Sequence, residues 1–207
     1  SFPTRRSSDL ENQVDKKWKM DTSLLELYGK TIGFIGTGTI ANEAAKRFQG
    51  FGVTILGVNT SGHDAEYFDR CYAMDKLREM LKLCDVVVVT VSYTKSTHHL
   101  INKDMFNSMK DGTFFINVAR GNIVDEHFLI KSLKNGKLAG AAIDVYEEEP
   151  LKENSELWEL DNIILTSHNS WISQMRNERR FETIYENMKR YIISENLVNI
   201  VILKRGY

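Results

Sequence analysis

The sequence is poor in the residues that mark special environments. It has two prolines and two cysteines in 207 residues, and its charges nearly cancel to a formal net charge of −1. Cys71 and Cys84 have neither metal-ligand spacing nor the density of a disulfide scaffold, so we expect no metal site and a reducing, cytoplasmic setting. Because no charge excess marks a nucleic-acid or membrane surface, we expect neither partner.

Long apolar runs are also missing. The longest, VVVVTV after Asp85, is far shorter than the roughly 20 residues that a membrane-spanning helix needs. The composition, with 42% hydrophobic and 27% charged residues, is ordinary for a globular protein. The length allows one good-sized domain together with part of another.

Short β-branched segments alternate with longer amphipathic stretches from Lys30 onward, which is typical of βαβ units around a parallel sheet. We predict an α/β fold, a Rossmann-type doubly wound parallel sheet. The predicted strands are 30–36, 53–59, 85–92, 112–119, 138–146 and 162–166, with the uniformly apolar third strand at the centre. The predicted helices are 39–52, 75–84, 102–110, 125–136 and a long charged helix over 171–193 that does not resemble another crossover.

The stretch GFIGTGTIA carries a GxGxx[G/A] pattern with Gly36, Gly38 and Ala41. Such a turn allows the backbone to approach a pyrophosphate, whose charge then lies at the positive end of the following helix. The pattern alone also fits a tight structural turn. Here it follows a strand and opens a helix, which favours a dinucleotide site.

The second predicted strand ends at Asn59, followed by Thr60, Ser61, Gly62 and His63. A carboxylate at this place would accept hydrogen bonds from the ribose and repel a 2′-phosphate. A neutral asparagine removes the repulsion without supplying an arginine for the phosphate. We therefore expect NAD or NADP, with a lean to NADP or dual use, while a simple polar turn is the alternative.

Three further stretches each follow a predicted strand: NVARG from Asn117, DVYEEEP from Asp144 and LTSHNSW from Leu165. Ligands of open α/β sheets bind outside the carboxyl ends of the strands, so Arg120, Glu149 and His168 could converge there. Each also has a plain explanation, as a solvated loop charge, an acidic turn residue or a half-buried imidazole. The pattern by itself leaves these alternatives open.

From about Trp18 onward the chain closely resembles the D-isomer-specific 2-hydroxyacid dehydrogenases. The resemblance is carried by ELYGKTIGFIGTGTIA, DVVVVTVSYTKSTHHLIN, FINVARGNIVDE, GAAIDVYEEEP and NIILTSHNSW, in the family's order and spacing. It implies an oxidoreductase that moves a hydride between NAD(P)H and a small 2-oxo acid or D-2-hydroxy acid.

The resemblance also assigns roles to residues. It makes Arg120 the substrate-binding arginine, His168 the acid/base histidine and Glu149 the carboxylate that keeps that histidine protonated. Metal ligands are not implied. The cofactor residues that the motifs imply are Gly36, Gly38, Thr39, Ile40, Asn59, Val91, Ser92, Thr97, Val118, Ala119 and Asp144.

Several residues depart from the family pattern or stand outside it. Ala41 replaces a third glycine, and Ser92 replaces a common proline. His98 and His99 are interpreted as ordinary polar loop residues, because the family's catalytic histidine lies elsewhere. Trp171 either borders the substrate pocket or packs at a helix start.

The first ten residues, SFPTRRSSDL, match a common DNA-sequencing adapter translated in frame, so we interpret 1–10 as a non-native leader. The resemblance implies that 11–24 is a remnant and hinge of a flavodoxin-like substrate domain. It makes 25–170 the NAD(P)-binding domain, and 171–207 a helix and tail that return to the largely missing domain.

We accordingly expect a fragment with little or no turnover, and a homodimer for the full-length protein. A dinucleotide-sensing binding module, similar to the redox-responsive corepressors related to this family, is the alternative. An intact set of Arg120, Glu149 and His168 argues against pure sensing, because a sensor needs no general acid.

Overall fold

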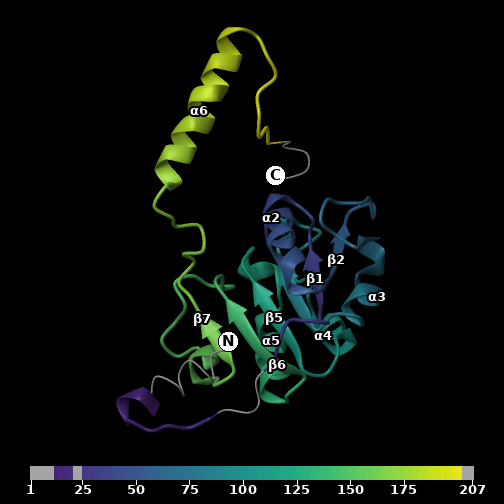
Figure 1. Ribbon diagram of the computed structural model, residues 1–207, viewed down its shortest axis with the longest axis vertical. Helices are drawn as coiled ribbons and strands as arrows, with labels where there is room; N and C mark the ends of the chain where they lie inside the picture. Colours follow the sequence, from purple (N-terminus) through teal and green to yellow (C-terminus); the bar gives the residue numbers. More distant parts are fainter. Residues whose placement is uncertain (1–11, 21–24, 202–207) are drawn as a thin grey trace. The chain divides into compact units, whose positions relative to one another are not determined.

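The structure, a computed structural model, describes residues 12–20 and 25–201 of the chain (Figure 1). The interpretation of 1–10 as a leader falls outside these ranges, and so do residues 11 and 21–24 of the segment interpreted as a remnant. The chain divides into two compact units, Ser1–Ser167 and His168–Tyr207, and each is described by itself.

The first unit is built around a seven-stranded sheet in the order β3-β2-β1-β4-β5-β6-β7. Every neighbouring pair is parallel. The strands are β1 Thr31–Ile35, β2 Thr54–Asn59, β3 Arg70–Ala73, β4 Val86–Val89, β5 Thr113–Asn117, β6 Leu138–Ile143 and β7 Ile163–Leu165. The order reverses between β1 and β4, which makes this a doubly wound sheet with a switch point beside β1 and confirms the predicted fold class.

The helices of the first unit lie on both faces of the sheet (Figure 1). They are α2 Thr39–Phe48, α3 Leu77–Leu81, α4 Lys103–Ser108 and α5 Glu126–Lys134, with short 3₁₀ turns at Gln49–Phe51, Met74–Lys76, Gly121–Ile123 and Glu156–Glu159. Alternate residues of β4 enter different buried clusters. Val87 and Val89 belong to the first cluster, and Val88 belongs to the second. The first cluster also takes residues of α3, α4 and α5, and the second takes those of α2, as right-handed crossovers require.

Local chemistry fixes where these elements begin. Asn102 caps α4 by accepting from the backbone amides of Asp104 and Met105, and Asp125 caps α5 by accepting from Phe128. The carboxylate of Asp85, just before β4, accepts from the Thr31 amide at 2.8 Å and from Lys110 Nζ at 2.9 Å. These two bonds connect β1, β4 and the segment before β5 at the amino edge of the sheet.

The structure differs from the sequence prediction in several bounds, and three differences stand out. The short strand β3 was not predicted, because RCYA lies at the edge of the sheet and has little apolar pattern. Helix α2 ends at Phe48, and a 3₁₀ turn follows where we predicted helix up to residue 52. The last helix begins at Arg176 instead of Trp171, because residues 169–172 form a turn in which the Ile172 amide donates to the Asn169 carbonyl.

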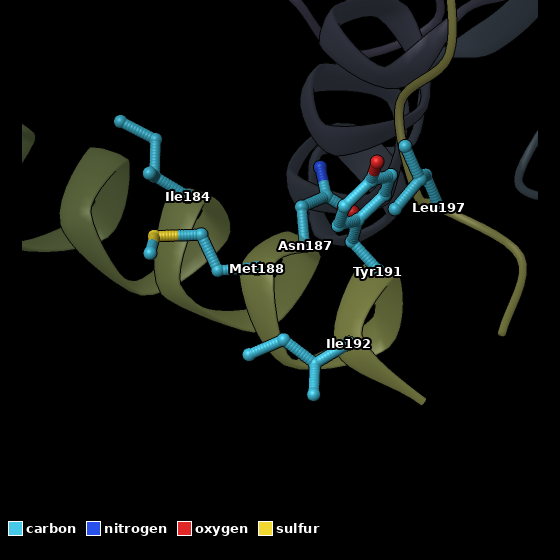
Figure 2. Close-up of a pocket in the computed structure, with 6 residues that line it drawn as sticks. All are labelled: Ile184, Asn187, Met188, Tyr191, Ile192 and Leu197. Carbon is cyan, nitrogen blue, oxygen red and sulfur yellow. The ribbon is translucent and has the colours of Figure 1, made fainter. Parts of the chain in front are cut away.

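The second unit contains the helix α6, Arg176–Ile192. None of its residues, all of which are described, is buried. Its apolar side chains gather along one side, and six residues of the helix and the following chain line a shallow hollow (Figure 2): Ile184, Asn187, Met188, Tyr191, Ile192 and Leu197. Among the described residues, no helix is both long and apolar enough to span a bilayer.

Candidate active site

The turn after β1 brings the backbone close to β4. Gly36 has a φ of +97°, and its amide donates to the Val58 carbonyl at 2.8 Å. A Cβ on Gly36 would lie 2.8 Å from the backbone nitrogen and Cα of Val91. The position therefore requires glycine both for its positive φ and for this close approach of the backbone. Thr90, which sequence reasoning missed, supports the turn by donating its hydroxyl to the carbonyls of Ile35 and Gly36.

The amino end of α2 is open to a ligand. Gly38 is the N-cap, it provides no side chain to bond the first amides of the helix, and a Cβ there would meet nothing within 4 Å. Thr39 and Ile40 of the first turn are exposed, Ile40 by 62%. An uncapped, accessible helix N-terminus after a glycine turn fits the pyrophosphate of a dinucleotide.

Asn59, at the end of β2, is buried and fully hydrogen-bonded within the protein. Its Nδ2 donates to Thr37 Oγ1 at 3.1 Å and to the His63 carbonyl at 2.8 Å. Its Oδ1 accepts from the amides of Gly62 and His63 at 2.8 and 3.1 Å. The carboxamide therefore shapes the 59–63 turn, and the exposed side chains of Ser61 and His63 are what that turn presents.

The loop after β4 is organised from within by Thr97. Its hydroxyl donates to the Ser92 carbonyl at 2.8 Å and accepts from the Thr94 amide at 2.7 Å. Thr97 is buried, while Val91 is half-buried and Ser92 exposed. Of the three expected cofactor residues in this loop, Thr97 thus holds the loop's shape and Ser92 offers an accessible hydroxyl.

The loop after β5 is held by a buried residue that was not among the candidates. Asn117 Nδ2 donates to the Arg120 carbonyl, and its Oδ1 accepts from the Ala119 amide, both at 3.1 Å. Val118 and Ala119 between them are half-buried. Arg120 is exposed, and its Nη1 donates to the Ala119 carbonyl at 2.6 Å, so the guanidinium lies at the carboxyl edge of the sheet.

The loops after β5 and β6 are in direct contact. A Cβ on Gly121 would lie 1.9 Å from the carbonyl carbon and oxygen of Tyr146. Tyr146 in turn donates its hydroxyl to the Thr166 carbonyl at 2.8 Å. Burial raises the pKa of Tyr146 to about 12, and the Asp144 carboxylate acts in the same direction, so the hydroxyl keeps its proton. The contact therefore fixes both loops after β5 and β6.

Asp144 and Glu149 both lie on the loop after β6, Asp144 at its start and Glu149 five residues further on. Asp144 is buried, its amide donates to the Asn117 carbonyl, and one carboxylate oxygen accepts from Thr166 Oγ1 at 2.5 Å. Glu149 is exposed, and its Oε1 accepts from the Tyr146 amide at 3.0 Å. The first carboxylate is thus built into the sheet edge, and the second is held by its own loop.

His168 belongs to the second unit, three residues after the end of β7. It is half-buried with a φ of +48°, and its carbonyl accepts from the indole nitrogen of Trp171 at 2.6 Å. The Trp171 ring also lies against the guanidinium of Arg176, at 4.4 Å from its centroid. Trp171 therefore packs at a helix start, one of the two alternatives that the sequence left open.

The cysteines take no part in these contacts. Cys84 is buried, where its thiol donates to the Met80 carbonyl, and burial raises the pKa of this thiol to about 12. Burial likewise raises the pKa of Cys71. Within the described ranges, no group of three or more His, Cys, Asp or Glu side chains is placed to hold a metal ion.

A family model described as "D-isomer specific 2-hydroxyacid dehydrogenase, NAD binding domain" matches residues 3–170. The chain belongs to the D-isomer-specific 2-hydroxyacid dehydrogenase family. The matched region includes every strand of the sheet and all of the candidate residues. It confirms the resemblance drawn from the five motifs, and it identifies the matched region as an NAD-binding domain of this family.

Relatives within the family include proteins that are named for a specific enzyme activity. The chain is 40% identical to a glyoxylate reductase of Pyrococcus horikoshii over 182 residues, which are 86% of this chain and 54% of the relative. It is 34% identical to a D-3-phosphoglycerate dehydrogenase of Methanocaldococcus jannaschii over 85% of this chain and 34% of that protein. The chain thus spans about half the length, or less, of these curated relatives.

Solved structures of the family share the fold. A D-isomer specific 2-hydroxyacid dehydrogenase of Xanthobacter autotrophicus Py2, in complex with NADPH and MES, aligns with a TM-score of 0.86 and 30% identity, over 99% of this chain and 84% of that one. An NADPH-dependent glyoxylate/hydroxypyruvate reductase of Sinorhizobium meliloti, in complex with NADP and sulfate, aligns with a TM-score of 0.87 and 25% identity, over 99% and 65%.

Proposed function

We propose that the intact protein transfers a hydride between NAD(P)H and a small 2-oxo acid, giving a D-2-hydroxy acid, and that this chain is its cofactor-binding portion. The observation that carries the proposal is topological. Arg120, Glu149 and His168 follow β5, β6 and β7, which are neighbours in the sheet, and the loops concerned begin at its carboxyl edge. This is the edge at which open α/β sheets bind their ligands.

The cofactor would be held by the turn after β1 and by the first turn of α2. There Gly36 allows the close approach of backbone, and the accessible amides of Thr39 and Ile40 suit a pyrophosphate. Asp144 is the buried carboxylate that we assign to the nicotinamide carboxamide, with Val118 and Ala119 beside it. When bound, the nicotinamide supplies or receives the hydride.

The chain's own residues would then bind the acid and move a proton. The planar fork of the Arg120 guanidinium suits the substrate carboxylate and places positive charge where the alkoxide develops. His168 would donate its proton to the carbonyl oxygen, since imidazole titrates near neutral pH. Glu149 would favour the protonated form of that imidazole through its negative charge.

We propose NADP, or both cofactors, as the physiological partner. The support is that Asn59 puts no negative charge at the end of β2 and that the turn it shapes presents the hydroxyl of Ser61 and the imidazole of His63. Two structural neighbours were solved with NADPH or NADP. Titration of the protein with NADH and NADPH tests this choice, and an NADH affinity about tenfold higher than that for NADPH would contradict it.

We further propose the domain assignment of the sequence analysis, in which 11–24 and 171–207 belong to a substrate domain and 25–170 binds the cofactor. The names of the relatives suggest glyoxylate or hydroxypyruvate as first substrates to try. The intact protein would act in the cytoplasm as a homodimer, whereas the 207-residue chain alone would bind cofactor and turn over little.

The decisive experiment measures NAD(P)H oxidation with glyoxylate, hydroxypyruvate and larger 2-oxo acids, using protein from the full reading frame. His168→Gln should lower kcat by about 10²- to 10⁴-fold with cofactor affinity unchanged, because the proton donor is lost. Arg120→Lys is the matched test of the substrate-binding residue. The lysine keeps the positive charge but loses the planar guanidinium that binds a carboxylate through two N–H groups, so KM should rise and kcat should fall.

The same variants separate this proposal from the sensing module. A dinucleotide sensor would bind NADH or NADPH, show no 2-oxo acid reduction and be indifferent to His168→Gln. Full activity in His168→Gln, or cofactor binding with no reduction of any 2-oxo acid by the intact protein, would contradict hydride transfer.

A further inference from the structure

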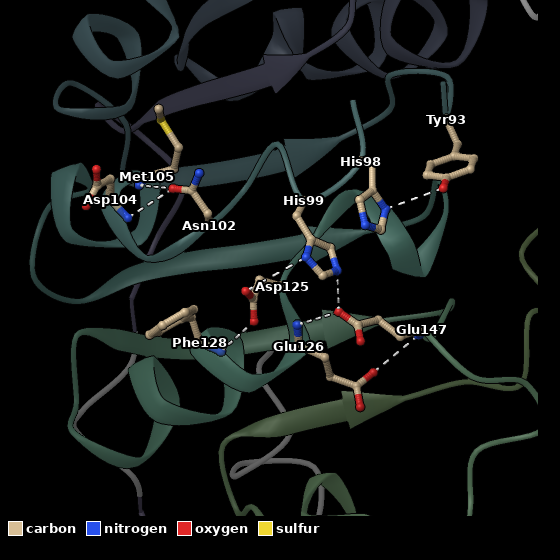
Figure 3. Close-up of polar contacts among 10 residues, drawn as sticks. All are labelled: Tyr93, His98, His99, Asn102, Asp104, Met105, Asp125, Glu126, Phe128 and Glu147. Atoms are coloured by element: carbon tan, nitrogen blue, oxygen red, sulfur yellow. Dashed lines mark hydrogen bonds and ion pairs between the residues drawn. The ribbon is translucent and has the colours of Figure 1, made fainter. Parts of the chain in front are cut away.

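Two adjacent histidines in the loop after β4 are not used by the proposed chemistry. Their rings stack with centroids 4.1 Å apart, and His98 Nδ1 lies 3.4 Å from the Tyr93 hydroxyl (Figure 3). His99 is the more constrained of the two. Its φ is +46°, a left-handed conformation for a residue with a side chain, and its amide donates to the Asn122 carbonyl at 2.9 Å.

The His99 ring joins two loops that are distant in the sequence. Its Nε2 lies 2.9 Å from Glu147 Oε1, and its Nδ1 lies 3.9 Å from Asp125 Oδ2. Figure 3 shows the imidazole between these two carboxylates, one from the loop after β6 and one from the N-cap of α5. A single side chain thus connects the segments that follow β4, β5 and β6.

Glu147 is held in place by a reciprocal pair of bonds with Glu126. The Glu126 amide donates to Glu147 Oε1 at 3.0 Å, and the Glu147 amide donates to Glu126 Oε2 at 3.4 Å. Partial burial raises the pKa of Glu126, with the nearby Glu147 charge adding to the effect. The oxygen that meets His99 is therefore already oriented by the helix start.

The two loops that His99 connects carry four of the residues assigned to the cofactor, and the carboxylate assigned to the catalytic histidine. Val91, Ser92 and Thr97 lie on the loop after β4, and Thr97 braces that loop two residues before His99. Asp144 and Glu149 lie on the loop after β6, on either side of Glu147. A shift of one loop against the other would misalign groups that must act on one ligand.

We propose that His99 is a positioning residue, which holds the loop after β4 in register with the loop after β6 through its bond to Glu147. The proposal rests on the cofactor roles proposed above for these loops. His99 itself need not touch the cofactor or the substrate. Its contribution is the relative placement of Ser92 and Asp144.

The test compares NADH and NADPH binding, by fluorescence of the bound nicotinamide, across single and double variants of the full-length protein. Loss of one hydrogen bond to a charged, partly exposed partner predicts a Kd about fivefold higher for His99→Ala. His99→Gln retains an N–H that can reach Glu147, so its Kd should return to within about twofold of the wild-type value.

A double-variant cycle asks whether the two residues act as a pair. If they do, His99→Ala combined with Glu147→Ala should bind no more weakly than either single variant. His98→Gln is the matched control, since it changes the neighbouring imidazole and leaves the Glu147 bond in place, and its Kd should stay within about twofold. The proposal would be overturned if the increases in Kd of the two single variants multiplied in the double variant. It would also be overturned if His99→Ala lowered the thermal midpoint and left Kd unchanged.

A readout without cofactor keeps this test separate from the proposed function. In His99→Ala, hydrogen exchange at the Tyr146 amide should become about fivefold faster, although the substitution lies on another loop. Unchanged exchange there would reject the positioning role whether or not the protein reduces 2-oxo acids. Absent activity with altered exchange would reject the hydride-transfer proposal alone.

Discussion

The two units of the chain place their apolar residues in opposite ways. In the first unit most apolar side chains of the sheet and helices are enclosed, and Met80 and Phe115 are both 0% exposed. In the second unit the apolar side of α6 stays accessible, and Met188 is 59% exposed. The same residue type is core in one unit and surface in the other.

This difference matters for stability. The sheet unit buries large side chains on both faces, each worth about 1.5–3 kcal/mol relative to an exposed position. Helix α6 has surface ion pairs instead, such as Arg190 with Glu186 at 2.9 Å, and pairs of this kind contribute little to stability because solvent screens them. An isolated helix of 17 residues is marginal in water, so the first unit carries the folding free energy.

Of the substitutions that test this comparison, Gly121→Ala should have the largest effect on the free energy of unfolding. The new methyl group would overlap the Tyr146 carbonyl at 1.9 Å, which is backbone and cannot rotate away. We expect the free energy of unfolding of the sheet unit to fall by about 4 kcal/mol or more, measured by urea denaturation.

Gly50→Ala is the matched control, because a Cβ there meets nothing within 4 Å and its φ lies outside the left-handed region. It should be neutral or slightly stabilising, since alanine restricts the unfolded chain. Equal stability of the two variants would show that the loops after β5 and β6 can separate without cost.

A smaller loss should follow Asp85→Ala. Partial burial opposes the charge of Asp85, but the Thr31 amide and the Lys110 ammonium outweigh it and hold the pKa of the carboxyl below its usual value. Hydrogen bonds to charged groups contribute about 1.5–3 kcal/mol, so we expect a loss of about 2 kcal/mol at pH 7.

The pH dependence supplies the sign of this effect. A carboxyl whose pKa is lowered in the folded state stabilises the fold at pH values above its ordinary pKa. This stabilisation is lost as the pH falls through the pKa of the folded state. The wild-type advantage over Asp85→Ala should therefore shrink in acid, below about pH 4. Asp111→Ala serves as control, because that carboxylate is 91% exposed and its pair with Lys137 should contribute little.

Much of the sheet could be predicted because its signal is local. The run VVVV at β4 has no polar face, and the structure places that strand at the centre of the sheet, as expected. The edge strand β3 was missed because Arg70 and Cys71 show no such pattern. The start of α6 was placed at Trp171 from apolar spacing, which does not register the turn at Asn169.

The candidate site was only partly predictable, for a similar reason. The sequence shows that Gly36 and Arg120 follow strands, because motif and strand lie side by side. It does not show that Asn117 orders the turn at Arg120. Nor does it show that both the oxygen and the nitrogen of the Asn59 carboxamide are hydrogen-bonded within the 59–63 turn. The pair of His99 and Glu147 is 48 positions apart, so only the fold brings it together.

The smallest effect should come from Met188→Ala, and its matched partner is Met80→Ala. Removing a buried methionine leaves a cavity and costs about 2–5 kcal/mol, so Met80→Ala should destabilise the sheet unit strongly. Met188 leaves no enclosed space behind, and its replacement should change the free energy of unfolding of the 207-residue chain by less than about 0.5 kcal/mol.

Hydrogen exchange of the same two variants locates the effect. Amides of β4 should exchange only through global opening, and Met80→Ala should accelerate them, whereas amides of α6 should exchange quickly in every variant. If Met188→Ala instead cost more than about 1 kcal/mol, the apolar side of α6 would already be stabilising the folded chain, and the contrast between the two units would fail. A small loss would leave this side available to the substrate domain that we propose α6 belongs to.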